Sequence, residues 1–104
     1  MSRIDSIKKI VETSPNDPFP RYGLAMEYKN AGRVDDAHAE FVELERRFPD
    51  YVPQYLMHAN VLQAMKRNAD ARGVLERGLE AAAKKRDAHA QSEMQAALDA
   101  LDGD

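Results

Sequence analysis

Three histidines have the widest chemical capacity in this sequence, since an imidazole can bind a metal or transfer a proton. His38, His58 and His89 are separated by 20 and 31 positions. This spacing contains neither the HExxH pattern nor two histidines four residues apart on one helix. The chain has no cysteine, which excludes a thiolate nucleophile and a Cys-based zinc site. The sequence therefore predicts no bound metal.

The other residues capable of chemistry are scattered along the chain. Asp35 and Asp36 are adjacent, but they stand at the predicted start of a helix, where the helix dipole favours anions. The dipole explains the pair better than acid–base catalysis does. The five glycines form neither a dinucleotide-binding nor a phosphate-binding loop, and the serines lie outside a nucleophile elbow. We expect no enzymatic activity and no cofactor.

Charge and composition restrict the possible partners. The formal net charge is −3, which disfavours general attraction to nucleic acid or to an anionic membrane. The basic clusters are Lys66-Arg67 and Lys84-Lys85-Arg86. Both fall at the expected carboxyl-terminal ends of helices, where the negative end of the helix dipole attracts cations. Contact with an acidic peptide or a phosphate is the alternative for these clusters. No secretory segment and no apolar run of about 20 residues is present, so we expect a soluble, cytoplasmic protein.

Amphipathic helices must position all of these side chains. Hydrophobic residues make up 43% of the chain and charged residues 32%, while Val, Ile and Thr are too sparse for several strands. Apolar residues recur at steps of three and four, and Pro, Gly or Asn interrupts the pattern four times, with a fifth break at Lys85-Arg86. The pattern predicts an all-α protein with six helices, at about 3–13, 19–30, 34–48, 53–65, 69–84 and 87–101.

Individual residues in these helices carry further expectations. Gly32 is placed to end a helix in the left-handed conformation, and Asn68 is expected to cap a helix where the corresponding glycine is missing. Gly78 weakens its helix by about 1 kcal/mol, which suggests close contact with another helix. We expect His58 to be a packed core residue with one hydrogen bond, whereas His38 and His89 are expected at the surface.

The chain resembles itself at an offset of 34 residues, as Pro15 and Pro49 illustrate. Such a period is typical of stacked helical hairpins, which bury their apolar faces only against their neighbours. Residues 18–51 resemble a tetratricopeptide repeat, and residues 52–85 resemble a degenerate second copy. The matching positions are Leu24, Ala25, Tyr28, Gly32, Ala37, Phe41, Leu44 and Pro49 in the first copy, and Tyr55, Ala59, Leu62, Ala71, Leu75 and Gly78 in the second.

Three positions of the second copy depart from the family pattern. His58 replaces a core Leu, Lys66 the turn Gly and Ala83 the closing Pro. The first copy departs at Arg21, where the family has Trp. The resemblance implies a single domain that is an antiparallel helix-hairpin array with a right-handed superhelix. It would contain an N-terminal half-repeat helix (1–17), two repeats (18–51 and 52–85) and a capping helix (86–104).

The resemblance also implies where a partner would bind. In this family the first helices of the repeats line a concave groove. The corresponding residues here are Tyr22, Met26, Lys29, Leu56, Asn60 and Gln63. One subtype of the family holds a peptide's terminal carboxylate with Lys and Asn. Tyr22, Met26 and Met57 stand at those places here, so no such clamp is expected.

Two functions remain open at this point. The first is an adaptor that binds a peptide or protein segment in the groove, with apolar contacts supplying affinity. The alternative is a structural subunit that self-associates, for example as a homodimer, through the groove or through the ends of the array. The identity of the partner does not follow from the sequence. Nucleic acid and membranes are not expected as partners.

Overall fold

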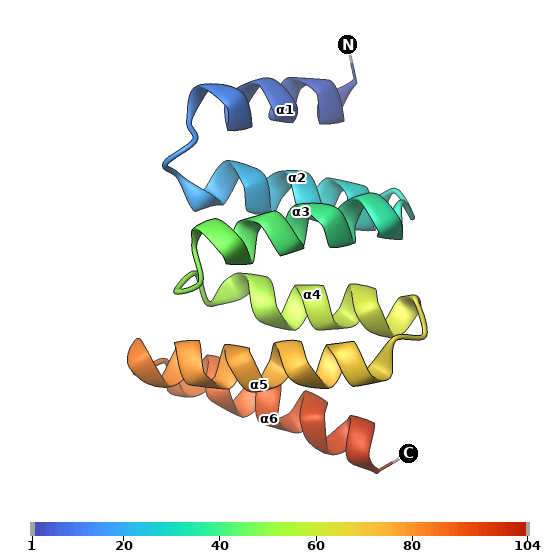
Figure 1. The fold of residues 1–104 in the computed structure, drawn as a ribbon, viewed down its shortest axis with the longest axis vertical. Helices are drawn as coiled ribbons and strands as arrows, with labels where there is room; N and C mark the ends of the chain where they lie inside the picture. Colours follow the sequence, from blue (N-terminus) through green and yellow to red (C-terminus); the bar gives the residue numbers. More distant parts are fainter. Residues whose placement is uncertain (1, 104) are drawn as a thin grey trace.

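The computed structural model describes residues 2–103 and shows an elongated stack of antiparallel helices, 43 × 29 × 19 Å in extent (Figure 1). Every regular element among the described residues is helical, which confirms the predicted all-α class. The bounds agree with the predicted ones to within one or two residues. They are α1 Arg3–Thr13, α2 Pro18–Asn30, α3 Val34–Arg47, α4 Pro53–Ala64, α5 Asn68–Lys84 and α6 Ala88–Asp102.

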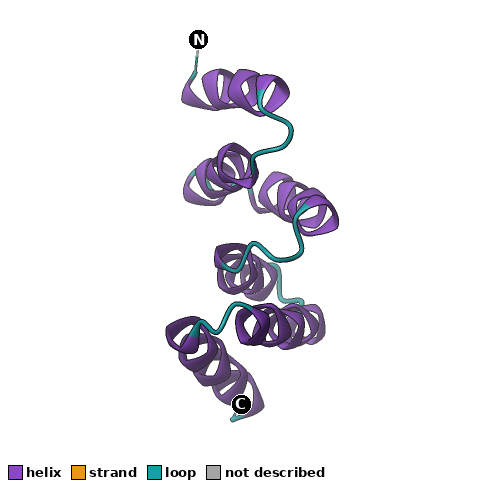
Figure 2. Cartoon of the chain, turned by 90° about the vertical axis from the view of Figure 1, so that its left-hand side faces the viewer, coloured by secondary structure: helices purple, strands orange, loops and turns teal. Residues whose placement is uncertain are grey.

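The helices form two layers, which are best seen in Figure 2. Helices α2, α4 and α6 lie on one side, with α4 in contact with both of the others. Helices α3 and α5 form the other side. Consecutive helices pack against one another throughout, whereas α6 is inclined to the rest of the stack. The chain therefore presents one surface made of α2, α4 and α6 and an opposite one made of α3 and α5.

Three of the turns share one hydrogen-bond pattern. In each, a backbone N–H after the turn donates to a carbonyl five residues earlier, at 2.8 Å from Arg33 to Tyr28 and at 2.8 Å from Arg67 to Leu62. The same bond is 2.9 Å long between α5 and α6. This is the Schellman geometry, which needs a left-handed residue. The residues in that conformation are Gly32 (φ 76°), Lys66 (φ 62°) and Arg86 (φ 55°).

The turn between α4 and α5 corrects one expectation. Asn68 does not cap a helix; it is the first residue of α5, and Arg67 takes the cap position without a side-chain hydrogen bond. Lys66 takes the position that Gly32 has in the preceding turn, so the backbone adopts the same left-handed geometry with a side chain that strains it. The expectation for Gly32 is confirmed, because it is left-handed and directly precedes the α3 cap residue.

The ends of α3 and α5 differ because one proline is missing. Pro49 follows Phe48, the C-cap residue of α3, and a proline cannot continue a helix. At the corresponding place α5 has Ala83, which is compatible with a helix, and α5 continues to Lys84. The connection to α6 is consequently short, and α5 and α6 pack as a tight hairpin.

The apolar core consists of two clusters. The N-terminal cluster belongs mainly to α1, α2 and α3, and the C-terminal one to α4, α5 and α6. No helix in the described part of the chain is both long enough and apolar enough to span a membrane. The buried members are Val11, Leu24, Ala25, Tyr28, Ala37, Phe41, Leu44 and Val61 in the first cluster, and Val52, Tyr55, Ala59, Leu62, Ala71, Val74, Leu75, Ala81, Ala82, Met94 and Leu98 in the second.

Gly78 is the point of closest approach within the C-terminal cluster. A Cβ atom placed on Gly78 would lie 2.6 Å from the Cβ of Tyr55 and 2.5 Å from the Sδ of Met94. Both distances are shorter than atoms tolerate, so only glycine fits between α4 and α6 at this position. The close helix contact expected at Gly78 is confirmed.

Candidate functional site

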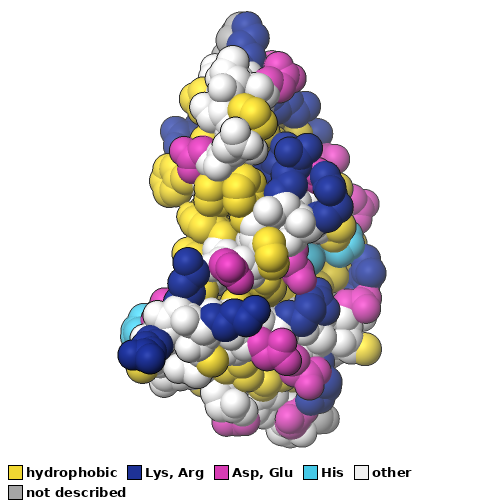
Figure 3. Space-filling model, turned by 60° about the vertical axis from the view of Figure 1, so that its left-hand side comes forward, with side chains coloured by type: hydrophobic (Ala, Val, Ile, Leu, Met, Phe, Trp, Pro, Cys, Tyr) yellow, Lys and Arg dark blue, Asp and Glu magenta, His cyan; other side chains and the backbone are white. Residues whose placement is uncertain are grey.

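A cavity of about 280 Å³ lies between α2, α4 and α6. It occupies the side of the molecule where α2, α4 and α6 begin, and Figure 3 shows hydrophobic side chains gathered on this side, with Lys and Arg beside them. Most of the lining is apolar, which suits a buried side chain of a partner. The lining residues are Tyr22, Val52, Pro53, Leu56, Met57, Asp87, His89, Ala90, Glu93 and Met94.

Tyr22 is fixed in this cavity by two aromatic neighbours. Its ring meets Phe41 edge-on at 6.4 Å and Tyr51 edge-on at 5.5 Å between centroids. Such edge contacts are favourable because the positive rim of one ring meets the negative face of the other. Burial raises the pKa of Tyr22 above its usual value of 10, so the phenol is neutral at physiological pH. The cavity therefore has a preformed, uncharged aromatic wall.

The structure brings together only part of the predicted groove set. Tyr22 and Leu56 both line the cavity. Met26 packs instead on the N-terminal cluster. Lys29 and Gln63 are half-buried and Asn60 is exposed, on the same helices but outside the cavity lining. Four predicted groove residues therefore lie outside the cavity lining: Met26, Lys29, Asn60 and Gln63. Their part in binding stays a prediction.

The sequence left open whether the last helix covers the groove; it did not predict that α6 forms a wall of the cavity, nor that the first turn of α2 exposes an aromatic ring. Phe19, three residues before Tyr22, is 66% exposed and lies outside the cavity lining. A further step of 34 residues from Leu56 leads to Ala90, which also lines the cavity. That extension of the period could have identified α6 as the third wall. Met57 was noted only as a departure from the carboxylate clamp.

Helix α6 is rotated relative to the helices that it continues. Ala25 in α2 and Ala59 in α4 are fully buried, whereas Glu93, one more period along, is exposed. Met94 is buried in its place, at 1% exposure. A carboxylate at the small-residue position cannot be buried without a partner, so the rotation directs Glu93 to the cavity wall.

The charged groups around the cavity are of both signs. Asp87 caps α6 by accepting a hydrogen bond from the Ala90 N–H at 3.0 Å, and His89 Nε2 lies 3.2 Å from a Glu93 oxygen. Lys85 and Arg86 line an adjoining hollow together with Asp87. The rim therefore has no single sign, and apolar contact is what distinguishes this surface.

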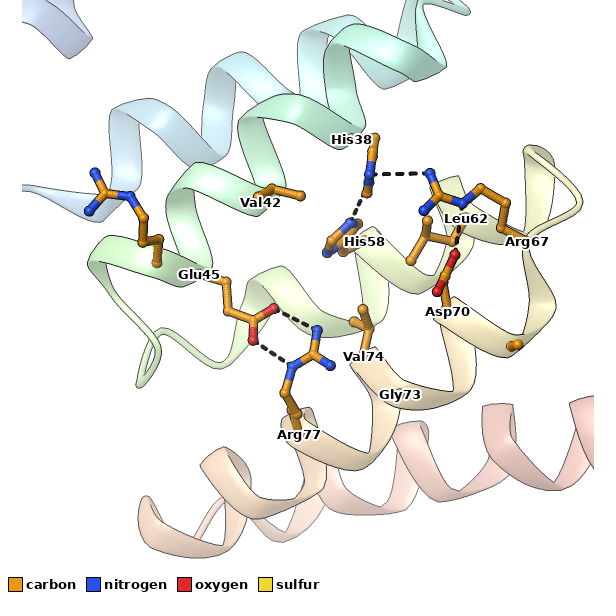
Figure 4. Close-up of a pocket in the computed structure, with 12 residues that line it drawn as sticks. His38, Val42, Glu45, His58, Leu62, Arg67, Asp70, Gly73, Val74 and Arg77 are labelled. Atoms are coloured by element: carbon orange, nitrogen blue, oxygen red, sulfur yellow. Dashed lines mark hydrogen bonds and ion pairs between the residues drawn. The ribbon is translucent and has the colours of Figure 1, made fainter.

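The opposite face contains a second, polar cleft of about 470 Å³ between α3, α4 and α5 (Figure 4). At its centre the Nδ1 of His38 and the Nε2 of His58 lie 2.9 Å apart. The His58 ring also stacks on Phe41, with 5.2 Å between centroids. Arg67 Nη1 lies 3.3 Å from the Nε2 of His38 and Arg67 pairs with Asp70 at 2.8 Å.

The histidine pair confirms one expectation and corrects another. His58 is a core residue, as predicted, with 3% exposure and one hydrogen bond. His38 was expected at the surface but is half-buried, because it turns toward His58 rather than toward water. His89 is exposed. Nothing in the sequence indicated the His38–His58 contact, since only the antiparallel packing of α3 and α4 brings these two positions together.

Burial determines the charge state of the pair. It lowers the pKa of His58 to about 4, helped by His38, Arg77 and Arg67. Burial and then Arg67 also lower the pKa of His38 below 6.5. Two neutral imidazoles can share one hydrogen bond, with one ring donating and the other accepting. Among residues 2–103 no group of three or more His, Cys, Asp or Glu side chains is arranged to hold a metal.

An ion pair between Arg77 and Glu45 lines the same cleft as the two histidines. Arg77 of α5 donates to Glu45 of α3 at 2.6 Å and 3.1 Å, as the dashed lines in Figure 4 show. The two parallel bonds form a bidentate pair, which fixes the geometry of both side chains. The cleft is thus a place where polar groups of α3 meet those of α4 and α5.

Comparison with known proteins supports the fold. No protein-family model matches the chain, and neither does any curated protein. A solution NMR structure of a tetratricopeptide repeat domain protein from Salinibacter ruber is 34% identical, with a TM-score of 0.81, covering 86% of this chain and 90% of the other. A crystal structure of such a protein from the same organism is 33% identical, with a TM-score of 0.79, covering 84% and 97%.

A third solved structure agrees in fold alone. The solution structure of a Bordetella parapertussis protein is 22% identical, with a TM-score of 0.81, covering 97% of this chain and 88% of the other. The Salinibacter ruber structures combine sequence identity above 30% with nearly complete coverage. Together with the 34-residue period and the repeated turns, they establish that this chain belongs to the tetratricopeptide repeat family.

Proposed function

We propose that this chain binds an apolar segment of another protein in the groove formed by α2, α4 and α6. A tetratricopeptide repeat fold indicates a protein-interaction module in general. The observation that supports the groove is the cavity of about 280 Å³ whose walls are Tyr22, Leu56 and Met57. Such a cavity can accept one large apolar side chain, and flexible Met side chains adapt to its shape.

The exposed Phe19 extends the apolar surface beyond the cavity. Phe19 and Tyr22 are three residues apart and therefore share a face of α2. A segment that fills the cavity with one side chain can cover Phe19 with another, and removal of this ring from water contributes to binding. Asn60, Gln63 and Lys29 would then hydrogen-bond to the backbone of the segment. The proposed role is non-catalytic and needs no cofactor.

The test is capture of a partner by a groove variant and by a matched control. Tyr22→Asp combined with Leu56→Asp places two carboxylates in the apolar cavity, and we expect binding to fall by at least 100-fold. The control is Ile10→Asp with Val42→Asp, since these residues are 50% and 49% exposed and lie outside the cavity lining. Circular dichroism checks that both variants stay folded. Binding that survives the groove change, or is lost in the control alone, would contradict the proposal.

Self-association is the second candidate. The observation in its favour is the exposed Ile10 on α1, together with Phe19. Two copies could cover these residues through the groove or through the ends of the array. Sedimentation over a wide concentration range tests this candidate, because a strictly monomeric chain at millimolar concentration would exclude it.

A further inference from the structure

The two hydrophobic clusters meet along a thin boundary between residues 18–51 and residues 52–85, here called the first and second repeat units. Val61 is the only buried α4 residue in the N-terminal cluster among those described. Met57 and Met65 add partly buried contacts to it. Apolar packing is therefore extensive within each unit and limited between them. A boundary of this kind is where one unit can turn relative to the other.

Polar groups hold the two units together at the cleft between α3, α4 and α5. His38 of α3 reaches His58 of α4 at 2.9 Å and Arg67 at 3.3 Å. Glu45 of α3 reaches Arg77 of α5 at 2.6 Å. The cleft of about 470 Å³ separates these contacts (Figure 4). The central contact is thus a hydrogen bond between two titratable rings, where the first unit has Leu24 at the equivalent place.

We infer that the His38–His58 pair is an acid-sensitive contact between the repeat units, and that its protonation lets the units turn relative to each other. When both rings are protonated, both facing nitrogens carry hydrogen and neither can accept. Two positive charges would then face each other across 2.9 Å. Their repulsion in a half-buried site exceeds the net value of one neutral hydrogen bond.

The surrounding charges do not offset this repulsion. Arg67 and Arg77 lower the pKa of His58, and Arg67 lowers that of His38. Asp70 and Asp35 act in the opposite direction on His38. The carboxylates in the cleft are already engaged, since Asp70 pairs with Arg67 and Glu45 pairs with Arg77. Protonation therefore takes place below the usual pKa of 6.5, in the range down to about 4.

The two clusters explain why the expected response is a movement rather than unfolding. Each unit keeps its own buried core when the polar contacts of this cleft are lost. The remaining contacts across the boundary are those of Val61, Met57 and Met65 and the stacking of His58 on Phe41. The two methionine side chains are flexible and tolerate a change of angle. This inference concerns the conformation of the array and does not depend on what the groove binds.

Distances between pairs of spin labels provide the test, since the chain has no cysteine of its own. The first pair, Ala39→Cys with Glu76→Cys, joins exposed positions of α3 and α5 across the boundary. The second pair, Ala64→Cys with Glu76→Cys, lies within the second unit and serves as the control. Between pH 7.5 and 4.0, a range that reaches the lowered pKa of His58, we expect the first distance distribution to shift and broaden, and the second to stay unchanged.

Variants assign the response to the histidines. His58→Leu restores the residue type of the first unit, and we expect it to abolish the shift. His38→Gln keeps a group that can hydrogen-bond but cannot be protonated in this range, so the shift should shrink. His89→Gln is the matched control and should respond like the unchanged protein. The inference is overturned if the first distance stays constant, if it changes only together with the second, or if either His58→Leu or His38→Gln responds fully.

Discussion

The two repeat units perform the same packing task with different residues. The first unit has Leu24, Gly32, Leu44 and Pro49 at the family positions. It forms a standard hairpin with a left-handed glycine at the turn and a helix that ends at Arg47. The second unit has a different residue at each of these positions, namely His58, Lys66, Gly78 and Ala83. The comparison shows which departures the fold absorbs at low cost and which create a new feature.

Each departure in the second unit has an identifiable structural effect. His58 replaces an apolar core contact with a hydrogen bond to His38. Lys66 keeps the turn but strains it, at φ 62°. Gly78 allows Tyr55 and Met94 to approach, and Ala83 allows α5 to continue to Lys84. The second unit is therefore adapted to receive α6, which becomes a wall of the groove.

Restoration of the family proline should have the largest effect. Ala83→Pro removes a helical N–H and brings the ring against the carbonyl one turn earlier, so we expect a loss of about 3 kcal/mol or more in the free energy of unfolding. Pro49→Ala is the matched change in the first unit and should cost less than about 1 kcal/mol, since Pro49 lies outside α3. Urea unfolding measures both. Equal effects of the two substitutions would contradict the comparison.

Acid should destabilise the protein through His58. Its pKa is about 4 in the folded chain and about 6.5 in the unfolded chain, so the folded state binds fewer protons between these values. Stability is therefore full above pH 6.5 and is lost as the pH falls, by about 2 kcal/mol at pH 5 and about 3 kcal/mol at pH 4.

Comparison with His58→Leu isolates this effect from that of the carboxylates. Urea unfolding at pH 7 and pH 5 measures how much unfolding free energy the unchanged protein and the His58→Leu variant each lose over this interval. We expect the variant to lose about 2 kcal/mol less than the unchanged protein over this interval. The same pH dependence in both would show that His58 is not the responsible group.

Substitution of Gly78 tests the close approach on α5. Gly78→Ala places a methyl group 2.6 Å from the Cβ of Tyr55, and we expect a loss of about 1–3 kcal/mol from overpacking. Gly73→Ala is the control on the same helix, because its methyl group would meet only an arginine nitrogen at 3.4 Å. There we expect a gain of about 0.5–1 kcal/mol from helix propensity. The melting temperature should therefore fall for Gly78→Ala and rise for Gly73→Ala. A change of the same sign in both variants would contradict the close approach at Gly78.

Relief of the strained turn should have the smallest effect. Lys66→Gly removes the side chain from a left-handed residue and should stabilise the protein by about 1 kcal/mol. The reverse change in the first unit, Gly32→Lys, should destabilise it by a similar amount. Chemical denaturation measures the two values. If Lys66→Gly has no effect or lowers stability, the left-handed geometry is not a source of strain.

Local patterns were enough to predict most of the fold. Prolines, glycines and the three-to-four spacing set the helix ends to within one or two residues, since these signals act within a few positions. The turn at Lys66 was predicted less well, because Asn68 offered a plausible cap in the same segment. The comparison with Gly32 at the fixed period placed Lys66 at the turn glycine, but it did not predict that a lysine would keep the left-handed conformation there.

The site was harder to predict from the sequence than the fold, because it depends on contacts between segments that are distant in the chain. Tyr22 and Leu56 were placed in the groove through the family resemblance, and the structure brings them together. The third wall needs the rotation of α6, which follows from the length of α5 and the burial of Met94. The His38–His58 contact needs the angle between α3 and α4. Neither feature leaves a local pattern in the sequence.

Methionine-methyl NMR provides the most direct test of the proposed groove. Met57 and Met94 line the cavity, whereas Met65 packs against both clusters outside it. On addition of a partner captured by the chain, we expect the methyl signals of Met57 and Met94 to shift and that of Met65 to stay in place. The Tyr22→Asp, Leu56→Asp variant should show no shifts at the same partner concentration. Binding that leaves Met57 and Met94 unchanged would contradict the proposal that the groove is the binding surface.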